Sequence, residues 1–196
     1  MIEEIIGKKI YEKKIKEKPE EFLYPLKTYE NLYKLLDEAK KSKSFIYNNE
    51  KINVLPVLEY YKNEYGKEEK HVYGRALYVK HNENIYIILY KSILSLSKME
   101  ARAIIAHELG HAISYVDMKQ GKRKLSNKNQ ELIADKNIEK YLKNIKIEKE
   151  DRQAIYYILK KMRTAKDGRY DNLFKGIKYL KDHFFGFSSN QNIDLF

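Results

Sequence analysis

The feature that most constrains the fold is a long helical segment in the middle of the chain, MEARAIIAHELGHAISYVD at residues 99–117. Ser97 precedes this segment and Glu100 follows three residues later, which is the spacing of a capping box at a helix N-terminus. Gly121 stands where a glycine commonly ends a helix. These signals predict one continuous helix over residues 98–120.

Two faces of the predicted helix carry different side chains. Apolar residues four, three and four positions apart form a stripe that should face the core: Ile105, Leu109, Ala112 and Val116. His107 and His111 share another face, because residues four apart lie one turn apart on the same side of a helix. Two imidazoles in this arrangement can bind one Zn²⁺, and Glu108 beside them can take a proton from a metal-bound water.

A metal site of this kind needs a third protein ligand. The chain of 196 residues contains no cysteine, so this ligand must be a histidine or a carboxylate. Asp117 holds the position of the last ligand in an HExxHxxGxxH motif, but that motif needs a glycine where this chain has Ser114. Asp117 therefore stays a weaker alternative.

A stronger source of the third ligand is the segment NQELIADKNIEKYL at 129–142. Its predicted helix places two carboxylates on the same face as apolar residues: Glu131, Ala134, Asp135, Ile138 and Leu142. Carboxylates buried without partners are costly, and a metal ion with its ligands would be a suitable partner. Glu131 is predicted as the third ligand, and Asp135, one turn later, as the acceptor of a hydrogen bond from a ligand histidine.

The rest of the chain predicts an α+β fold that is mostly helical, with a small antiparallel β-sheet packed on the histidine-bearing helix. HVYGRALYVK and NIYIILYKS are rich in β-branched and aromatic residues and are joined by HNEN, so they predict a β-hairpin. Helices are expected at 2–16, 28–39, about 53–66, 98–120, 128–144, 149–165 and 170–184. We expect one compact domain made of an N-terminal helical segment (1–50), a metal-bearing core (51–146) and a C-terminal helical segment (147–196).

Composition argues against several classes of function. The net charge of +11 comes from lysines that are mostly interleaved with glutamates, a pattern of solvated helix faces rather than of a nucleic-acid surface. A denser basic cluster at 119–128, KQGKRKLSNK, lacks aromatic residues and is a candidate for steering an acidic protein substrate. The N-terminus has no signal-peptide pattern, and the longest apolar run, at 85–90, is too short to cross a bilayer. We expect a soluble cytoplasmic protein without a membrane partner.

The two motifs together resemble a known class of enzymes. HELGH at 107–111 followed by ELIAD at 131–135 resembles the gluzincin zinc metallopeptidases. The order of a helix before Gly66, a strand with Gly74, the strand IYIILYKSIL and these two motifs is similar to the ImmA/IrrE family over about residues 52–145. The resemblance implies a zinc-dependent endopeptidase with one Zn²⁺ that cleaves an intracellular protein, such as a helix-turn-helix transcriptional repressor.

Some roles stay open at the level of sequence. Candidates for stabilising the oxyanion of the transition state lie toward the C-terminus: His183, Tyr156, Tyr157 and Tyr170. The strand at 85–90 is expected to offer an edge to which an extended substrate can pair. The alternative function is a catalytically silent, zinc-stabilised regulatory module that binds DNA or protein. The intact Glu108 argues against this alternative, since a purely structural zinc site needs no base.

Overall fold

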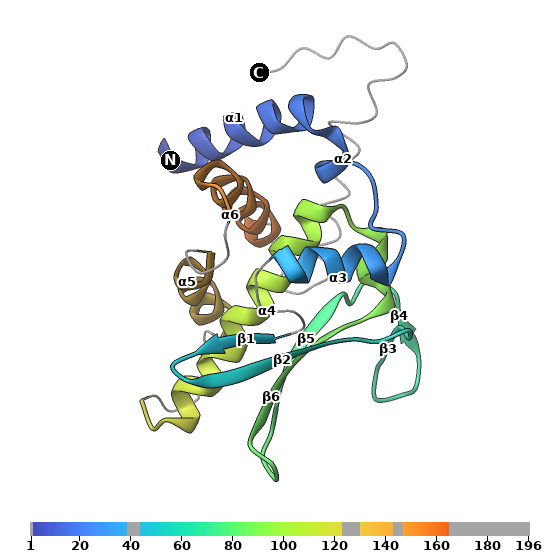
Figure 1. Ribbon diagram of the computed structural model, residues 1–196, viewed down its shortest axis with the longest axis vertical. Helices are drawn as coiled ribbons and strands as arrows, with labels where there is room; N and C mark the ends of the chain where they lie inside the picture. Colours follow the sequence, from blue (N-terminus) through green and yellow to red (C-terminus); the bar gives the residue numbers. More distant parts are fainter. Residues whose placement is uncertain (1, 39–43, 123–129, 143–146, 165–196) are drawn as a thin grey trace.

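The computed structural model describes residues 2–38, 44–122, 130–142 and 147–164, apart from some side chains within the helices. The first half of the chain forms α1 (Ile2–Glu17), α2 (Pro19–Phe22), α3 (Tyr29–Glu38), β1 (Ser44–Tyr47), β2 (Glu50–Pro56), β3 (Tyr61–Lys62), β4 (Glu68–Glu69), β5 (Gly74–Val79) and β6 (Asn84–Leu89). A 3₁₀ turn, η1 (Lys91–Ser95), leads to α4 (Lys98–Lys119), α5 (Gln130–Leu142) and α6 (Lys149–Thr164). The expected α+β fold is confirmed (Figure 1).

The main sheet has the strand order β1-β2-β6-β5 and is mixed rather than antiparallel. β1 pairs with β2 and β5 pairs with β6 in antiparallel fashion, which confirms the hairpin expected at 71–92. β2 and β6, in the middle, run parallel, with Ile52 opposite Ile85. A separate small sheet of β3 and β4 lies in the connection between β2 and β5. The expectation of a purely antiparallel sheet is therefore wrong at its central pair.

The parallel pair exists because the segment expected to be a helix from about Asn53 is strand β2. Within it Ile52 and Val54 are buried, whereas Lys51 and Leu55 are exposed, so burial alternates with period two. The strand begins after a two-residue turn at Asn48 and Asn49, whose φ values of 47° and 66° are those of a tight hairpin turn. Apolar residues in this segment are weakly spaced as in a helix, but pairing with the distant strand β6 makes the segment a strand.

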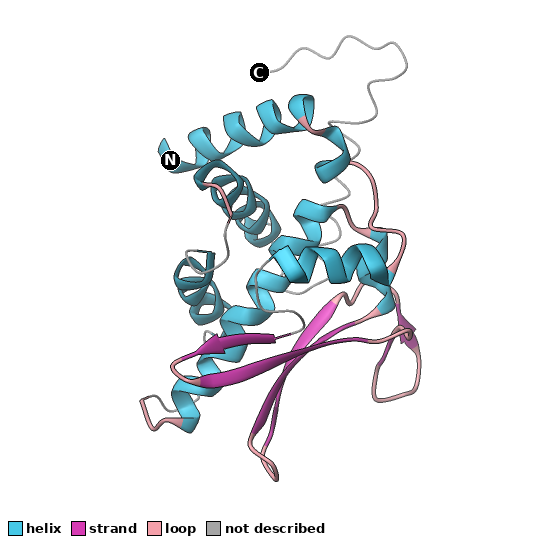
Figure 2. Cartoon of the chain, viewed as in Figure 1, coloured by secondary structure: helices cyan, strands magenta, loops and turns pink. Residues whose placement is uncertain are grey.

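Helix α4 lies in the centre of the molecule, with the strands on one side and α1, α5 and α6 on the other (Figure 2). Its aliphatic side chains belong to a buried cluster shared with the sheet and α3, and they include the predicted stripe: Ile105, Leu109, Ala112 and Val116. On its other side Met99, Ala103 and Ala106 belong to a second cluster, shared with α1, α5 and α6. Because it is buried on both sides, α4 is the central element of the fold.

Both ends of α4 are as predicted. The Ser97 hydroxyl accepts a hydrogen bond from the Glu100 amide at 3.3 Å, and the Glu100 carboxylate accepts one from the Ser97 amide at 2.7 Å. These two bonds complete the capping box. At the other end Gly121 has a φ of 68°, the left-handed conformation that glycine adopts most readily.

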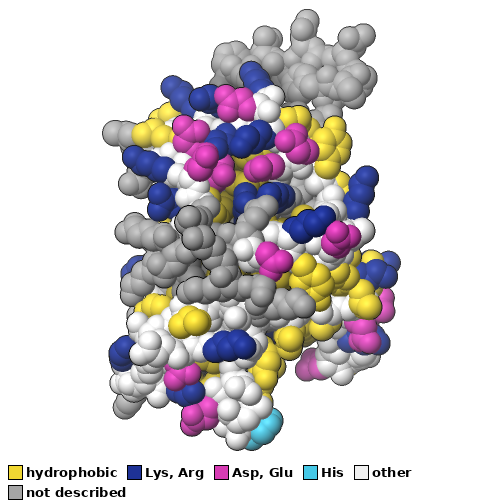
Figure 3. All heavy atoms as spheres, in the orientation of Figure 1, with side chains coloured by type: hydrophobic (Ala, Val, Ile, Leu, Met, Phe, Trp, Pro, Cys, Tyr) yellow, Lys and Arg dark blue, Asp and Glu magenta, His cyan; other side chains and the backbone are white. Residues whose placement is uncertain are grey.

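The surface charge is arranged as short-range pairs over α1. Lys8 with Glu12 and Lys13 with Glu17 form pairs one turn apart, and basic and acidic side chains mix over this helix in Figure 3. This pattern fits solvated helix faces rather than one continuous basic surface. Among the described residues, no helix has both the length and the apolar character to cross a bilayer. The helix expected at 170–184 lies outside the described residues.

Candidate metal centre

Three side chains from α4 and α5 converge beside the middle of α4. The Nε2 atoms of His107 and His111 are 3.2 Å apart. The two oxygens of the Glu131 carboxylate reach them separately, Oε2 at 3.0 Å from His107 and Oε1 at 3.3 Å from His111. Among the described residues these three form the group of His, Asp and Glu side chains that can hold a metal ion.

The spacing of these atoms is compatible with three side chains that bind one metal ion. For comparison, Zn–N and Zn–O bonds of about 2.0–2.2 Å in a tetrahedron place neighbouring ligand atoms about 3.3–3.6 Å apart. The three measured separations, from 3.0 to 3.3 Å, are at or just below the lower end of that range. Two imidazoles and one carboxylate therefore form a donor set that can hold one metal ion.

The electrostatics favour Glu131 in its charged form. Partial burial raises the pKa of the Glu131 carboxyl, but hydrogen bonds from His107 and His111 and their electrostatic attraction outweigh it and hold the pKa well below its ordinary value. Glu131 also lies in the first turn of α5, where the helix dipole stabilises a negative charge. An ionised carboxylate is the form in which this side chain binds metals.

Glu131 is more exposed than the sequence indicated. Its side chain is 55% exposed, whereas those of His107 and His111 are only 11% and 14% exposed. Ala134 and Ile138 on the same helix are buried, as expected. The carboxylate thus lies at the rim of the core rather than within it, and the centre is accessible to solvent on the α5 side.

The other candidates from the sequence are not brought to this centre by the described part of the chain. Asp117 lies on α4 but is not a member of the group that can hold a metal. Asp135 follows Glu131 by one turn of α5, but its side chain lies outside the described residues, as do His183 and Tyr170. On α6, Tyr157 packs against Tyr11 of α1, and Tyr156 is partly exposed.

Glu108 points to the sheet side of α4. The residue is only 1% exposed, and its Oε2 accepts a hydrogen bond from the backbone amide of Ala76 in β5 at 2.8 Å. A side chain at Gly74 would come within 3.2 Å of the Glu108 Cγ, so β5 passes closely over this carboxylate. Sequence reasoning missed this contact. The glycine within the strand pattern was the available signal, since such a glycine often marks a close approach.

The edge strand of the sheet that contacts Glu108 is β5, not the strand at 85–90. That strand, β6, lies between β2 and β5 and is paired on both sides, so the expected substrate edge is wrong. β5 is the last strand of the sheet in the described part of the chain. Because the Ala76 amide bonds to Glu108, the backbone groups of Ala76 point away from β6, toward this edge.

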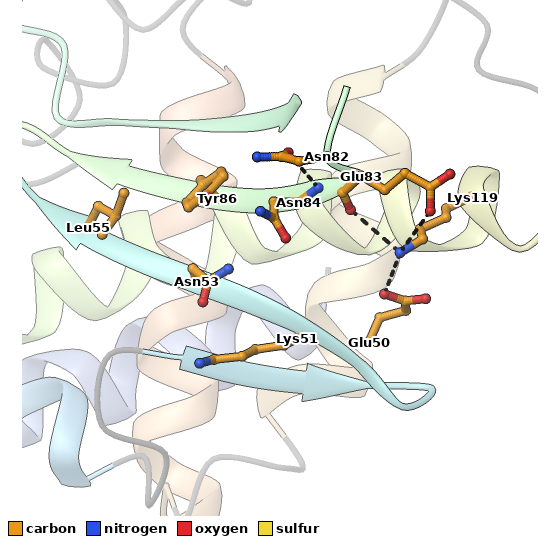
Figure 4. A pocket seen from close by; sticks show the side chains of 9 residues that line it. All are labelled: Glu50, Lys51, Asn53, Leu55, Asn82, Glu83, Asn84, Tyr86 and Lys119. Carbon is orange, nitrogen blue, oxygen red and sulfur yellow. Dashed lines mark hydrogen bonds and ion pairs between the residues drawn. The ribbon is translucent and has the colours of Figure 1, made fainter. Parts of the chain in front are cut away.

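A cavity of about 500 Å³ opens on the face of the sheet opposite to the buried side chains of Ile52 and Val54 (Figure 4). Lys51, Asn53 and Leu55 of β2 line it together with Tyr86 of β6. None of the three candidate metal ligands lines this cavity. It is therefore separate from the metal centre.

The basic segment after α4 begins at this cavity rather than at the metal centre. The Lys119 Nζ lies 2.9 Å from a carboxylate oxygen of Glu50 and 3.5 Å from one of Glu83 (Figure 4). These ion pairs join the end of α4 to the start of β2 and to the turn between β5 and β6. It follows His111 by eight residues, about 12 Å along a helix. Residues 123–129 lie outside the described residues. The steering role expected of this segment gains no support from Lys119.

In comparisons with known proteins, the chain matches no family model, no curated protein and no solved structure at a significant level.

Proposed function

We propose that this chain is a zinc-dependent endopeptidase that cleaves an intracellular protein. The observation that carries the proposal is the convergence of His107, His111 and Glu131 at separations suited to one zinc ion, beside a buried Glu108 on the same helix. Three protein ligands that leave one position open are typical of catalytic zinc sites, whereas structural sites use four. A bound zinc ion would polarise the scissile carbonyl and lower the pKa of a bound water.

Glu108 is the proposed general base. The bond from the Ala76 amide holds its carboxylate between α4 and the edge of β5, next to the ligand histidines in the sequence. From there it would accept the proton of the attacking water and pass it to the leaving amine. A buried position supports this role, because low polarity strengthens the electrostatic interactions of a carboxylate.

An extended peptide segment is the proposed form of the substrate. β5 is the edge strand that contacts Glu108, and an added strand would pair with its backbone beyond the Ala76 amide, which donates to Glu108. Tyr78 of β5 and Tyr115 of α4 stack with ring centres 6.2 Å apart and would offer an aromatic surface to such a segment. A helix-turn-helix repressor remains the substrate that the resemblance to the ImmA/IrrE family implies.

Replacing Glu108 tests the proposal. Glu108→Gln keeps the size of the side chain and removes the base, so zinc content and thermal stability should stay close to wild type. Cleavage should fall by about 10²–10⁴-fold, as is typical for loss of a general base. The measurement is mass analysis of a candidate helix-turn-helix repressor incubated with the zinc-loaded wild type or the variant.

Two outcomes would contradict the proposal. A variant that cleaves as fast as wild type would remove Glu108 from the mechanism. A wild type that binds zinc and binds the repressor, but leaves every peptide bond intact, would favour the zinc-stabilised binding module.

A further inference from the structure

Helices α4 and α5 touch backbone to backbone beside the metal ligands. A Cβ atom added at Gly110 would lie 2.1 Å from the carbonyl oxygen of Ala134 and 2.6 Å from its carbonyl carbon, so no side chain fits there. Gly110 lies between the two ligand histidines in the sequence, and Ala134 lies three residues after Glu131. The close contact therefore brings the third ligand to the histidine pair.

A buried amide fixes this contact. Asn137 of α5 is 6% exposed, and its Nδ2 donates to the Gly110 carbonyl oxygen at 3.2 Å and to the Ser114 hydroxyl at 3.1 Å. The Ser114 hydroxyl lies 3.3 Å from the same carbonyl oxygen and donates to it. One side chain of α5 is thus bonded to two consecutive turns of α4.

Small residues alone would not hold α5 in one orientation. Ala103, Ala106, Gly110 and Ser114 form the side of α4 nearest the helices, and they offer few side-chain ridges to interlock. A rotation of α5 by about 10° would move a side-chain tip 5–6 Å from its axis by about 1 Å. A metal site tolerates deviations of only about 0.2 Å in its metal–ligand distances, so such a rotation would disrupt the centre.

We propose that Asn137 is a positioning residue of the metal centre, which sets metal affinity by fixing α5 so that Glu131 meets His107 and His111. The inference rests on the proposed zinc site. Asn137 acts through the backbone of Gly110 and through Ser114. Directional hydrogen bonds in a buried contact fix one arrangement, whereas the apolar packing of Ile138 on the same helix is tolerant of small shifts.

The test compares zinc affinity with stability in three variants. Asn137→Leu should weaken zinc binding by about 10–100-fold, the loss typical when a residue that orients metal ligands is removed. Ser114→Ala should weaken it in the same direction by a smaller factor, because the bond to Gly110 remains. Ile138→Ala, a matched change at the next residue, should lower the thermal midpoint but leave zinc affinity unchanged. Zinc affinity is measured by competition with a chelator. The midpoint of thermal unfolding is measured with and without zinc.

The outcomes separate the inference from the function on which it rests. Asn137→Leu with a lower midpoint but wild-type zinc affinity would make Asn137 structural only and overturn the inference. If Asn137→Leu does not fold, Ser114→Ala decides, and wild-type affinity in that variant would overturn the inference too. A wild type that binds no zinc would overturn the metal centre itself, and the inference with it.

Discussion

The side of α4 that faces the sheet and the side that faces the other helices are built from residues of different size. The sheet side presents branched aliphatic residues, all buried: Ile104, Ile105, Leu109, Ile113 and Val116. The helix side presents small residues: Ala103, Ala106, Gly110 and Ser114. Large side chains bury more apolar area, whereas small ones let two backbones approach.

The candidate centre uses both sides. Glu108 belongs to the sheet side, where β5 covers it. His107 and His111 lie next to the small residues, where α5 comes close enough to supply Glu131. The comparison indicates that the sheet side mainly supplies stability and holds the proposed base, while the helix side mainly sets the geometry of the candidate ligands.

Removing the third ligand should have the largest effect on the helix side. Glu131→Ala should lose most of its zinc, a greater loss than the about 10–100-fold expected when only a supporting hydrogen bond is removed. Asp117→Ala is the control, because this carboxylate shares α4 with the histidines but is not part of the group that can hold a metal. Metal analysis after dialysis measures the effect. Zinc retained by the Glu131 variant would exclude that residue as a ligand.

A truncation on the sheet side should act mainly on stability. Leu109→Ala should lower the free energy of unfolding by about 2–5 kcal/mol, since Leu109 is fully buried and the change leaves a cavity. Zinc affinity of the folded variant should change far less than in Glu131→Ala, because Leu109 packs in the cluster shared with the sheet and not against α5. Urea denaturation and zinc titration provide the two values. A parallel fall in zinc affinity would break the distinction between the two sides.

A single methyl group on the helix side should lower zinc affinity as well as stability. Gly110→Ala forces α5 away from α4 and should lower the free energy of unfolding by about 1–3 kcal/mol. The better helix propensity of alanine, about 1 kcal/mol, offsets part of this loss. Zinc affinity should nevertheless fall, because Glu131 moves with α5. Unchanged zinc affinity in Gly110→Ala would show that the close contact does not position the ligand.

What could be predicted from the sequence was local. The capping box of Ser97 and Glu100 and the shared face of His107 and His111 depend on residues within one helix, so their spacing was sufficient. Glu131 was found because a carboxylate among apolar residues needs a partner, although its exposure was misjudged.

The contacts that could not be predicted join distant parts of the chain. The bond between Glu108 and Ala76 spans 32 positions, and that between Asn137 and Gly110 spans 27. No local pattern encodes such a pairing. The same holds for β2, where residues spaced as in a helix form a strand because β6 lies alongside.

The parallel pairing of β2 with β6 joins two hairpins that can fold separately, β1 with β2 and β5 with β6. β1 with β2 and β5 with β6 each close through a short turn, so each can form early and at a small cost in loop entropy. Docking of the two hairpins must close the long connection that contains β3 and β4, and is the slower step. We therefore expect the native sheet to open first between β2 and β6, which hydrogen exchange would detect. β5 and Glu108 should remain in the half of the sheet that stays packed on α4.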